Sequence, residues 1–210
     1  KLEKLNLPNT FTKVRNGGVK TIFISNNKEF ALISSKKDEC FYSSIVFLEN
    51  GKELFKTKCL PVKQIVDYNG LGSSNIHLKN NIFFSIGAPE QTSYAIANLA
   101  QDSDSMYGKI LQINKSDLDN MILNGESNLD IKIFTTGHRN PQGLTKIDDS
   151  IFSVEHGPKG GDELNKIIKE RNYGWPKVFY GTKYDHDKEI KSYEISHENN
   201  QFEEPLFALV

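Results

Sequence analysis

Hydrogen-bonding side chains are concentrated in one short stretch of the sequence, Gly137–Leu144, which reads GHRNPQGL. Its polar members are His138, Arg139, Asn140 and Gln142. Pro141 stiffens the stretch and biases the residue before it toward an extended conformation. Polar groups that converge from the ends of rigid strands form binding sites, because the strands fix their positions. The stretch therefore predicts a ligand-binding loop, and a polar surface loop without function is the alternative.

A glycine-rich segment with several acids follows at Glu155–Asn165, which reads EHGPKGGDELN. Its glycines leave backbone carbonyls accessible, and its acids supply hard oxygen ligands. This combination is typical of a calcium-binding loop, and a glycine-rich turn with solvated acids is the alternative. The spacing fits neither an EF-hand, which alternates its acids, nor a phosphate-binding loop, which ends in Gly-Lys-Ser/Thr.

The sequence around both segments consists of short β-prone runs separated by polar turns. The predicted strands are Lys20–Ser25, Phe30–Ser34, Phe41–Leu48, Glu53–Thr57, Asn75–Lys79, Ile82–Ile86, Lys109–Ile113, Ile131–Thr136, Gly143–Ile147, Ile151–Val154 and Glu163–Ile168. Many short strands with regular turns are typical of a sandwich, a barrel or a propeller. Asn172–Pro176, which contains the only tryptophan, is predicted to pack a loop against the core.

Helical signals are few in this sequence. Ser93–Ala100 has the length of two helical turns. Ser116–Asp119 is a capping box, which predicts a short helix that continues to Leu123. Both segments lie between predicted strands, so we expect an all-β protein with two helical insertions.

The composition is that of an ordinary globular protein. The chain has 210 residues, of which 37% are hydrophobic and 25% charged, with a formal net charge of -1. This balance provides no basic surface for nucleic acid. No apolar run approaches the ~20 residues of a membrane-spanning helix. We therefore expect residues 1–210 to form a single domain that neither binds nucleic acid nor spans a membrane.

The two cysteines, Cys40 and Cys59, flank a predicted hairpin. Asn50 and Gly51 between two β-prone runs favour a type I′ turn, because both residues tolerate positive φ angles. A turn centred there places the cysteines roughly opposite each other on adjacent strands. A disulfide is then geometrically possible and would fit an exported protein, and two buried free thiols are the alternative.

Taken together, the segments at 137–144, 155–165 and 172–176 resemble, in order and spacing, the soluble quinone-dependent glucose/aldose sugar dehydrogenase family. The resemblance implies a six-bladed β-propeller that carries pyrroloquinoline quinone (PQQ) on one face and oxidises the C1 hydroxyl of aldoses. A four-stranded blade takes ~40–50 residues, so this chain would hold about four or five blades. Because Val210 falls within a blade, the chain is predicted to be a fragment of a longer protein.

For the quinone and the sugar, the resemblance implies roles for three residues of the first segment. Arg139 would contact the quinone or the sugar and stabilise developing negative charge. Asn140 would bind the quinone, and Gln142 would support the loop. All three belong to the polar cluster that the residue types alone identify as a candidate site.

The resemblance also implies two uses of calcium. The backbone carbonyls of Gly157 and Pro158 would hold the Ca²⁺ that polarises the quinone as a Lewis acid. Glu163 and the backbone around Tyr173 would belong to a second, structural calcium site. Both uses match the glycine-rich, acidic character of this part of the chain.

The sequence departs from the family where the catalytic base belongs. The family places a histidine base in a motif that matches Leu71–Ile76 here, and Leu71 stands at the histidine position. An aspartate that orients the histidine is replaced by Ala88, and the nearest histidine, His77, is out of register. General-base catalysis contributes ~10²–10⁴-fold in rate, so the loss of both groups predicts slow oxidation.

The leading hypothesis is a PQQ- and Ca²⁺-dependent dehydrogenase that acts on a small-molecule sugar or alcohol and is periplasmic or secreted. The runner-up is a non-catalytic propeller of the same family that binds a carbohydrate or a protein through its loop face. A purely structural propeller stabilised by calcium is the third hypothesis. The sequence does not identify the substrate, the electron acceptor or the oligomeric state.

Overall fold

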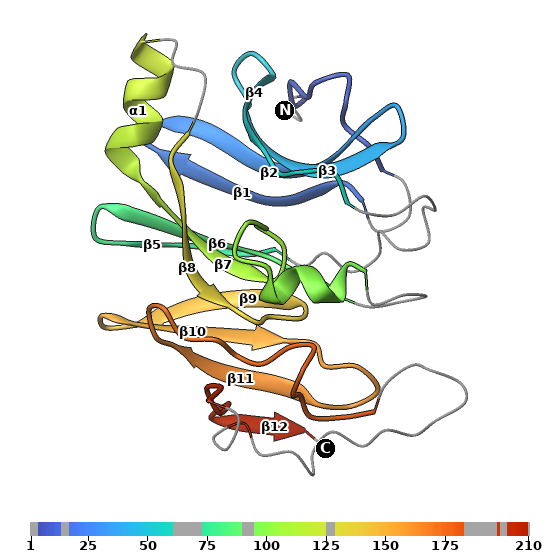
Figure 1. The fold of residues 1–210 in the computed structure, drawn as a ribbon. Coiled ribbons are helices and arrows are strands. Elements are labelled where there is room, and N and C mark those ends of the chain that lie inside the picture. The colour runs from blue at the N-terminus through green and yellow to red at the C-terminus, as the bar shows by residue number, and fades with distance from the viewer. Residues whose placement is uncertain are drawn as a thin grey trace.

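The computed structural model describes residues 4–13, 17–60, 73–89, 95–124, 129–182, 197 and 201–209. These residues form three four-stranded antiparallel sheets, as the all-β prediction expects (Figure 1). The first sheet consists of β1 (Val19–Ser25), β2 (Lys28–Lys37), β3 (Cys40–Phe47) and β4 (Lys52–Lys56). The second consists of β5 (Asn75–Leu78), β6 (Asn81–Ile86), β7 (Lys109–Asn114) and β8 (Ile131–Thr136). The third consists of β9 (Pro141–Ile147), β10 (Ser150–Glu155), β11 (Asp162–Ile167) and β12 (Phe207–Leu209).

The three sheets are stacked in chain order, with the second between the other two (Figure 1). The first strand of each sheet contacts the first strand of the next, so β1, β5 and β9 lie along the same side of the stack. Within each sheet the later strands follow outward in sequence order. This is the arrangement of blades in a β-propeller, in which the innermost strand comes first.

The described residues form three such blades rather than the four or five that the chain length suggests. The difference arises because the second and third sheets contain long connections. A 3₁₀ helix, η2 (Ala97–Gln101), and helix α1 (Lys115–Asn124) are inserted within the second sheet, and β12 joins the third only after a long excursion of the chain. The number of blades in a complete propeller of this kind stays a prediction.

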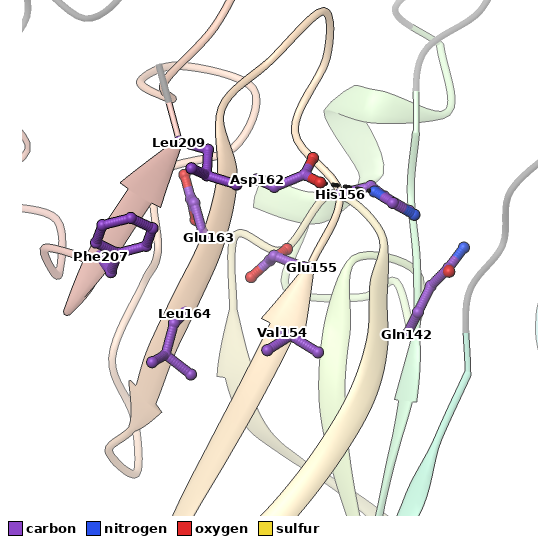
Figure 2. A pocket seen from close by; sticks show the side chains of 9 residues that line it. All are labelled: Gln142, Val154, Glu155, His156, Asp162, Glu163, Leu164, Phe207 and Leu209. Carbon is purple, nitrogen blue, oxygen red and sulfur yellow. Dashed lines mark hydrogen bonds and ion pairs between the residues drawn. The ribbon is translucent and has the colours of Figure 1, made fainter.

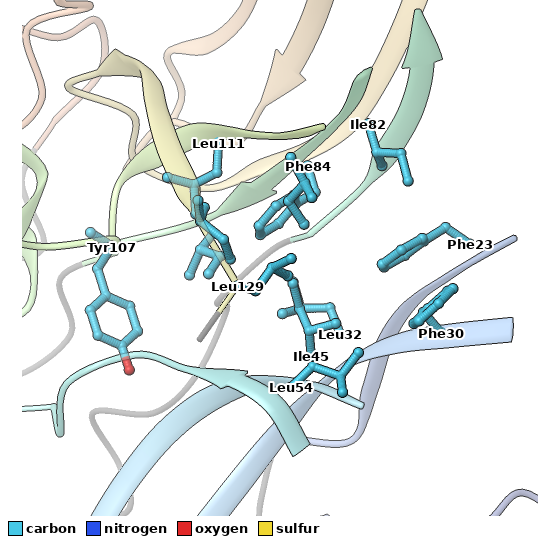
Figure 3. Packing of buried hydrophobic residues seen from close by; sticks show 14 of the residues in the cluster. Phe23, Phe30, Leu32, Ile45, Leu54, Ile82, Phe84, Tyr107, Leu111 and Leu129 are labelled. Atoms are coloured by element: carbon cyan, nitrogen blue, oxygen red, sulfur yellow. The ribbon is translucent and has the colours of Figure 1, made fainter. Parts of the chain in front are cut away.

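Side-chain alternation along β6 explains why the middle sheet is buried on both faces. Ile82 and Phe84 belong to the large core between the first and second sheets (Figure 3). Phe83 points the other way, into a smaller core that it shares with Ile151 and Ile167 of the third sheet. Successive strand residues face opposite sides of a sheet, so a continuous apolar run can serve two cores. Each fully buried side chain of this size contributes about 1.5–3 kcal/mol.

Tight turns between the strands follow from residues that accept positive φ angles. Asn26 and Asn27 connect β1 and β2 with φ angles of 46° and 61°, as a type I′ turn requires. The predicted hairpin at Asn50-Gly51 is present between β3 and β4, but its turn type differs. Its loop spans residues 48–51, and Gly51 alone has a positive φ, of 74°.

The inserted helices differ from the prediction in their details. Helix α1 occupies the predicted place, but its cap is Asn114, whose Oδ1 accepts a hydrogen bond from the amide of Ser116 at 3.0 Å. Within the predicted helix at 93–100, residues 93 and 94 lie outside the described residues, and η2 begins at Ala97. Neither helix of the described chain is long and apolar enough to cross a membrane.

The two cysteines form the disulfide that the hairpin makes possible. Cys40 begins β3, Cys59 follows β4, and their Cα atoms are 5.2 Å apart. The bond ties the start of β3 to the segment that follows β4.

Candidate functional site

The polar stretch identified in the sequence forms the junction between the second and third sheets. β8 ends at Thr136, and residues 137–140 cross to the start of β9. Gly137 makes this crossing with a φ of 79°, and its amide donates to the carbonyl of Ala100 at 3.1 Å. A β-carbon at this position would lie 2.1 Å from Oδ1 of Asn172, so the crossing requires glycine.

A chain of buried hydrogen bonds runs through the junction. Nε2 of His138 lies 2.8 Å from the hydroxyl of Thr135, and Nδ1 lies 2.9 Å from Oε1 of Glu155. The ring stacks on Tyr173 with centroids 4.6 Å apart. All these residues are buried, so residues 137–140 are packed inside the molecule and do not form an exposed surface loop, whereas Gln142 is exposed.

Arg139 is held at its backbone and at its guanidinium group. Its amide donates to Oε2 of Glu155 at 2.9 Å, and its carbonyl accepts from the amide of Ala88 at 2.7 Å. The guanidinium donates to the carbonyl of His156 at 2.8 Å and lies 5.3 Å from the ring of Trp175. Trp175 is in the core as predicted, and it is also the platform on which Arg139 lies.

The glycine-rich segment forms a closed loop beside Arg139. Gly160 and Gly161 have φ angles of 73° and 71°. Oδ1 of Asp162 accepts from the amide of Gly157 at 3.1 Å, which closes the loop at its base. Oδ2 of Asp162 lies 3.2 Å from Nδ1 of His156, whose side chain is 55% exposed. An imidazole held in this way can offer its second nitrogen to a ligand hydroxyl.

Two carboxylates face each other across β10 and β11. Glu155 pairs with Glu163 in the register, and the amide group of Asn165 donates to both, at 2.8 Å and 3.1 Å. Burial, together with the charge of Glu155, raises the pKa of Glu163 to about 8. The raised pKa means that the pair keeps a proton near neutral pH, which a bound cation would displace.

Two cavities meet at these acids. The smaller, of about 10 Å³, is lined by Arg139, Gly157, Pro158, Glu163 and Tyr173 together with other residues of the junction. The larger, of about 320 Å³, is drawn in Figure 2. Gln142, Glu155, His156 and Asp162 lie along its polar part, and Val154, Leu164, Phe207 and Leu209 line its apolar part.

Most residues predicted for the site are thus brought together, although not all in the same cavity. Gln142 lines the larger cavity, away from the guanidinium of Arg139. Asn140 is buried, and its carbonyl accepts from the amide of His156 at 3.1 Å. No three His, Cys, Asp or Glu side chains of the described chain gather closely enough to hold a metal on their own. A cation here would depend on backbone carbonyls as well, as Ca²⁺ commonly does.

The place of the missing catalytic base is only partly described. Leu71 lies outside the described residues. Ala88 is fully buried. Its amide donates to the carbonyl of Arg139 at 2.7 Å, and its carbonyl accepts from Nε1 of Trp175 at 2.8 Å, so an apolar residue stands next to Arg139. His77 pairs with Ile82 near the turn between β5 and β6, at the opposite end of the hairpin from Ala88.

The sequence-based prediction missed the anchors of the site. Thr135 and Asn165 were given no role by residue type, and Glu155 was predicted only as an oxygen ligand of a calcium loop, yet all three hold the junction in place. A signal for Glu155 exists in the strand alternation, because Ile151 and Ser153 occupy the same buried face of β10.

The fold and the site define a β-propeller segment with a buried cationic and acidic cluster at one junction. The model of the glucose/sorbosone dehydrogenase family matches residues 45–209. Aldose sugar dehydrogenase YliI of Escherichia coli is 34% identical over 111 residues, which cover 50% of this chain and 28% of that protein. Quinoprotein glucose dehydrogenase B of Acinetobacter calcoaceticus is 40% identical over 82 residues, which cover 37% of this chain and 16% of that protein.

Solved structures have the same fold. The apo form of the soluble aldose sugar dehydrogenase of Escherichia coli matches with a TM-score of 0.71 and 23% identity, over 95% of this chain and 60% of that one. The PQQ-bound aldose sugar dehydrogenase of Streptomyces coelicolor matches with a TM-score of 0.61 and 21% identity, over 95% of this chain and 55% of that one. The chain belongs to the glucose/sorbosone dehydrogenase family, whose model covers most of its length, and it spans only part of each of these relatives.

Proposed function

We propose that this chain contributes part of the active site of a PQQ- and Ca²⁺-dependent dehydrogenase that oxidises an aldose or a related alcohol. One observation carries the proposal: five of the residues expected in the site line a single small cavity, namely Arg139, Gly157, Pro158, Glu163 and Tyr173. The names of relatives support the chemistry, because one is a quinoprotein and another was solved with PQQ bound.

The residues present fit a calcium ion. The small cavity has room for about one water-sized guest, and a Ca²⁺ ion is of similar size. The carboxyl groups of Glu155 and Glu163 line it, and a cation would relieve the repulsion that raises the pKa of Glu163. Carbonyls of Gly157 and Pro158 would hold the ion that serves the quinone, and Glu163 with the backbone near Tyr173 would hold the structural one. Flexible oxygen ligands of this mixed kind suit Ca²⁺ better than Mg²⁺.

The residues present also fit part of a quinone site. PQQ, when bound, accepts the hydride that leaves C1 of the sugar, and Ca²⁺ polarises its carbonyl. Arg139 would bind the anionic quinone and stabilise negative charge as it develops, because its guanidinium is already held over Trp175. Asn140 would bind the quinone, and Gln142, exposed on β9, would support the loop.

The test is reconstitution of the full-length protein with PQQ and CaCl₂. Saturable changes in quinone absorbance and reduction of a dye by an aldose are the expected results. Arg139→Ala should weaken PQQ binding by roughly tenfold or more, because a hydrogen bond to a charged group is worth about 1.5–3 kcal/mol. Arg171, an exposed arginine paired with Glu203, provides the matched control Arg171→Ala, which should bind PQQ normally. Absence of PQQ binding by the unmodified protein would refute the proposed dehydrogenase activity.

A non-catalytic carbohydrate- or protein-binding propeller is the second candidate, and the buried methyl group of Ala88 favours it. No carboxylate can act from that position, and His77 lies at the other end of its hairpin. Under this alternative, Arg139→Ala should reduce retention of the protein on an immobilised glycan or partner without lowering its melting temperature. Unchanged retention would count against it.

We also propose that the protein is periplasmic or secreted, on the strength of the disulfide between Cys40 and Cys59. Disulfides persist in oxidising compartments and are rare in the cytosol. Protein extracted without reductant should resist thiol alkylation until it is denatured and reduced. Full alkylation of the denatured protein before reduction would contradict export.

A further inference from the structure

We propose that the buried hydrogen-bond chain Thr135–His138–Glu155 is a positioning device that fixes the guanidinium of Arg139 for ligand binding. The inference rests on the proposed function, because it assumes that Arg139 is the group that meets the ligand. None of the three residues is assigned a role by the family resemblance. All three are buried, and they hold Arg139 or its neighbours in place.

The order of the groups invites a different reading, which their burial rules out. A hydroxyl, an imidazole and a carboxylate in hydrogen-bonding sequence resemble a nucleophile with its base and orienting acid. Thr135, His138 and Glu155 are, however, only 1%, 0% and 6% exposed, so a substrate cannot reach the hydroxyl. The chain therefore acts within the protein, through the groups that it holds in place.

The two carboxylate oxygens of Glu155 accept from different residues, His138 and Arg139. Oε1 accepts from Nδ1 of His138 at 2.9 Å, while Oε2 accepts from the backbone amide of Arg139 at 2.9 Å. A carboxylate can accept on both oxygens, whereas a carboxamide can accept on only one. With Nδ1 as donor, Nε2 of His138 accepts from the hydroxyl of Thr135 at 2.8 Å, so the ring cannot flip without losing both bonds.

These bonds restrict Arg139 at its backbone, and the restriction continues to the side chain. The amide is held by Glu155 and the carbonyl by the amide of Ala88, so the peptide planes on both sides are fixed. The guanidinium then meets the carbonyl of His156 and the face of Trp175. Preorganisation of this kind reduces the entropy that a ligand would otherwise have to remove on binding.

Trp175 makes the proposal measurable without any cofactor, because it is the only tryptophan in these 210 residues and its signal is read as the difference between each variant and the unmodified protein. Its fluorescence reports on the guanidinium that lies 5.3 Å from its ring. Arg139→Ala defines the emission of an uncovered Trp175. Glu155→Gln should change the emission in the same direction by at least half as much, and should weaken PQQ binding roughly ten- to hundredfold, as loss of a supporting hydrogen bond does at other sites.

Ser153 provides the matched control on the same strand. It is buried two residues before Glu155, and its hydroxyl has no hydrogen-bond partner within the described part of the chain. Ser153→Ala should therefore leave the emission of Trp175 and the affinity for PQQ unchanged. All spectra are read well below the melting transition of each variant, so that loss of fold does not contribute.

Thr135→Val supplies a second test that removes only the hydroxyl bonded to Nε2 of His138. It should shift the emission in the same direction as Glu155→Gln, by a smaller amount. If Glu155→Gln does not fold, the emission of Thr135→Val alone tests whether the buried chain positions Arg139. Emission like that of the unmodified protein in every folded variant of the two would overturn the proposal. If the emission shifts as expected but the unmodified protein binds no PQQ, the positioning of Arg139 stands and the proposed function fails.

Discussion

Lys109 places an ammonium group inside the molecule, next to the junction that carries the site. The residue is fully buried, and its Nζ donates to three backbone carbonyls, those of Leu99, Ala100 and Tyr107, at 2.8, 2.8 and 3.0 Å. Ala100 also accepts from the amide of Gly137, so the lysine and the junction share an acceptor. Burial lowers the pKa of Lys109 to about 7, and the charge of Asp102 opposes part of this shift.

Replacement of Lys109 by Met should destabilise the protein by about 1–3 kcal/mol, because buried carbonyls lose a donor. The pKa of the folded state, about 7, lies below the value of 10.5 for an unperturbed lysine. Between these values unfolding takes up a proton, so a rise in pH opposes unfolding. The stability difference between the unmodified protein and Lys109→Met should therefore grow from pH 7 to pH 10 in urea titrations. A constant difference would mean that the carbonyls keep the ammonium protonated.

Gly137 and Gly18 form a matched pair for testing the junction itself. Both have positive φ angles, of 79° and 135°, but a β-carbon on Gly18 would meet no atom within 4 Å. On Gly137 it would lie 2.6 Å from the amide nitrogen of Gly174, a backbone atom that cannot move aside cheaply. Gly18→Ala should cost about 1–2 kcal/mol from backbone strain alone. Gly137→Ala should cost about 1–3 kcal/mol more by denaturant titration, and equal losses would show that the junction is loose.

At the scale of the element, the disulfide closes the outer part of the first sheet. Cys40 and Cys59 are 19 residues apart in sequence, and a bridge over a loop of this length stabilises by about 3 kcal/mol through the unfolded state. Reduction should lower the melting temperature by roughly 5–10 °C. The double variant Cys40→Ser, Cys59→Ser should melt at the reduced value and ignore the reductant. A reductant-sensitive double variant would point to an effect elsewhere in the chain.

The strands were predictable from sequence because their patterns are local. Ile82–Ile86 is an apolar run, interrupted only by Ser85, between polar turns, and it is a strand buried on both faces. The cap of α1 was not predictable in the same way, since Asn114 takes that role only because β7 ends there. β12 was missed because Phe207–Leu209 is defined by its pairing with β11 and not by a pattern of its own.

The site was predictable to the extent that its residues form contiguous motifs. Arg139 and Glu163 stand in such motifs, and the structure brings both to one cavity. The partners of Glu155 come from β8, from the junction and from β11, so its anchoring role depends on strand pairing between distant segments. No spacing in the sequence encodes that convergence, although the alternation in β10 places Glu155 on the buried face.

At the scale of the whole molecule, the position of the site follows from the stacking of the sheets. The middle sheet contributes to two cores, and the junction at 137–140 leaves it to begin the third sheet (Figure 1). Trp175 connects the core to the site, since its ring belongs to the large core and the guanidinium of Arg139 lies over its face. The geometry of Arg139 is therefore tied to the packing between sheets as well as to local hydrogen bonds.

Calcium should extend this connection to the stability of the entire fold. A ligand that binds only the folded state stabilises it, by about 2.7 kcal/mol at a concentration 100 times the Kd. The melting temperature of the full-length protein should consequently rise with CaCl₂ and fall in a chelator. Glu163→Gln should abolish most of this response, because it removes a carboxylate from the edge of the cavity.

Asp149 supplies the control for that experiment. Its carboxylate is 71% exposed and pairs with Lys79 at the far turn of the third sheet, so Asp149→Asn removes the same charge from a site without a cavity. This variant should keep the full calcium response, and MgCl₂ should not replace CaCl₂ because it tolerates flexible carbonyl ligands poorly. A calcium response that Glu163→Gln and Asp149→Asn retain equally would place the ion elsewhere. If neither CaCl₂ nor a chelator changes the melting temperature of the unmodified protein, calcium does not stabilise the fold.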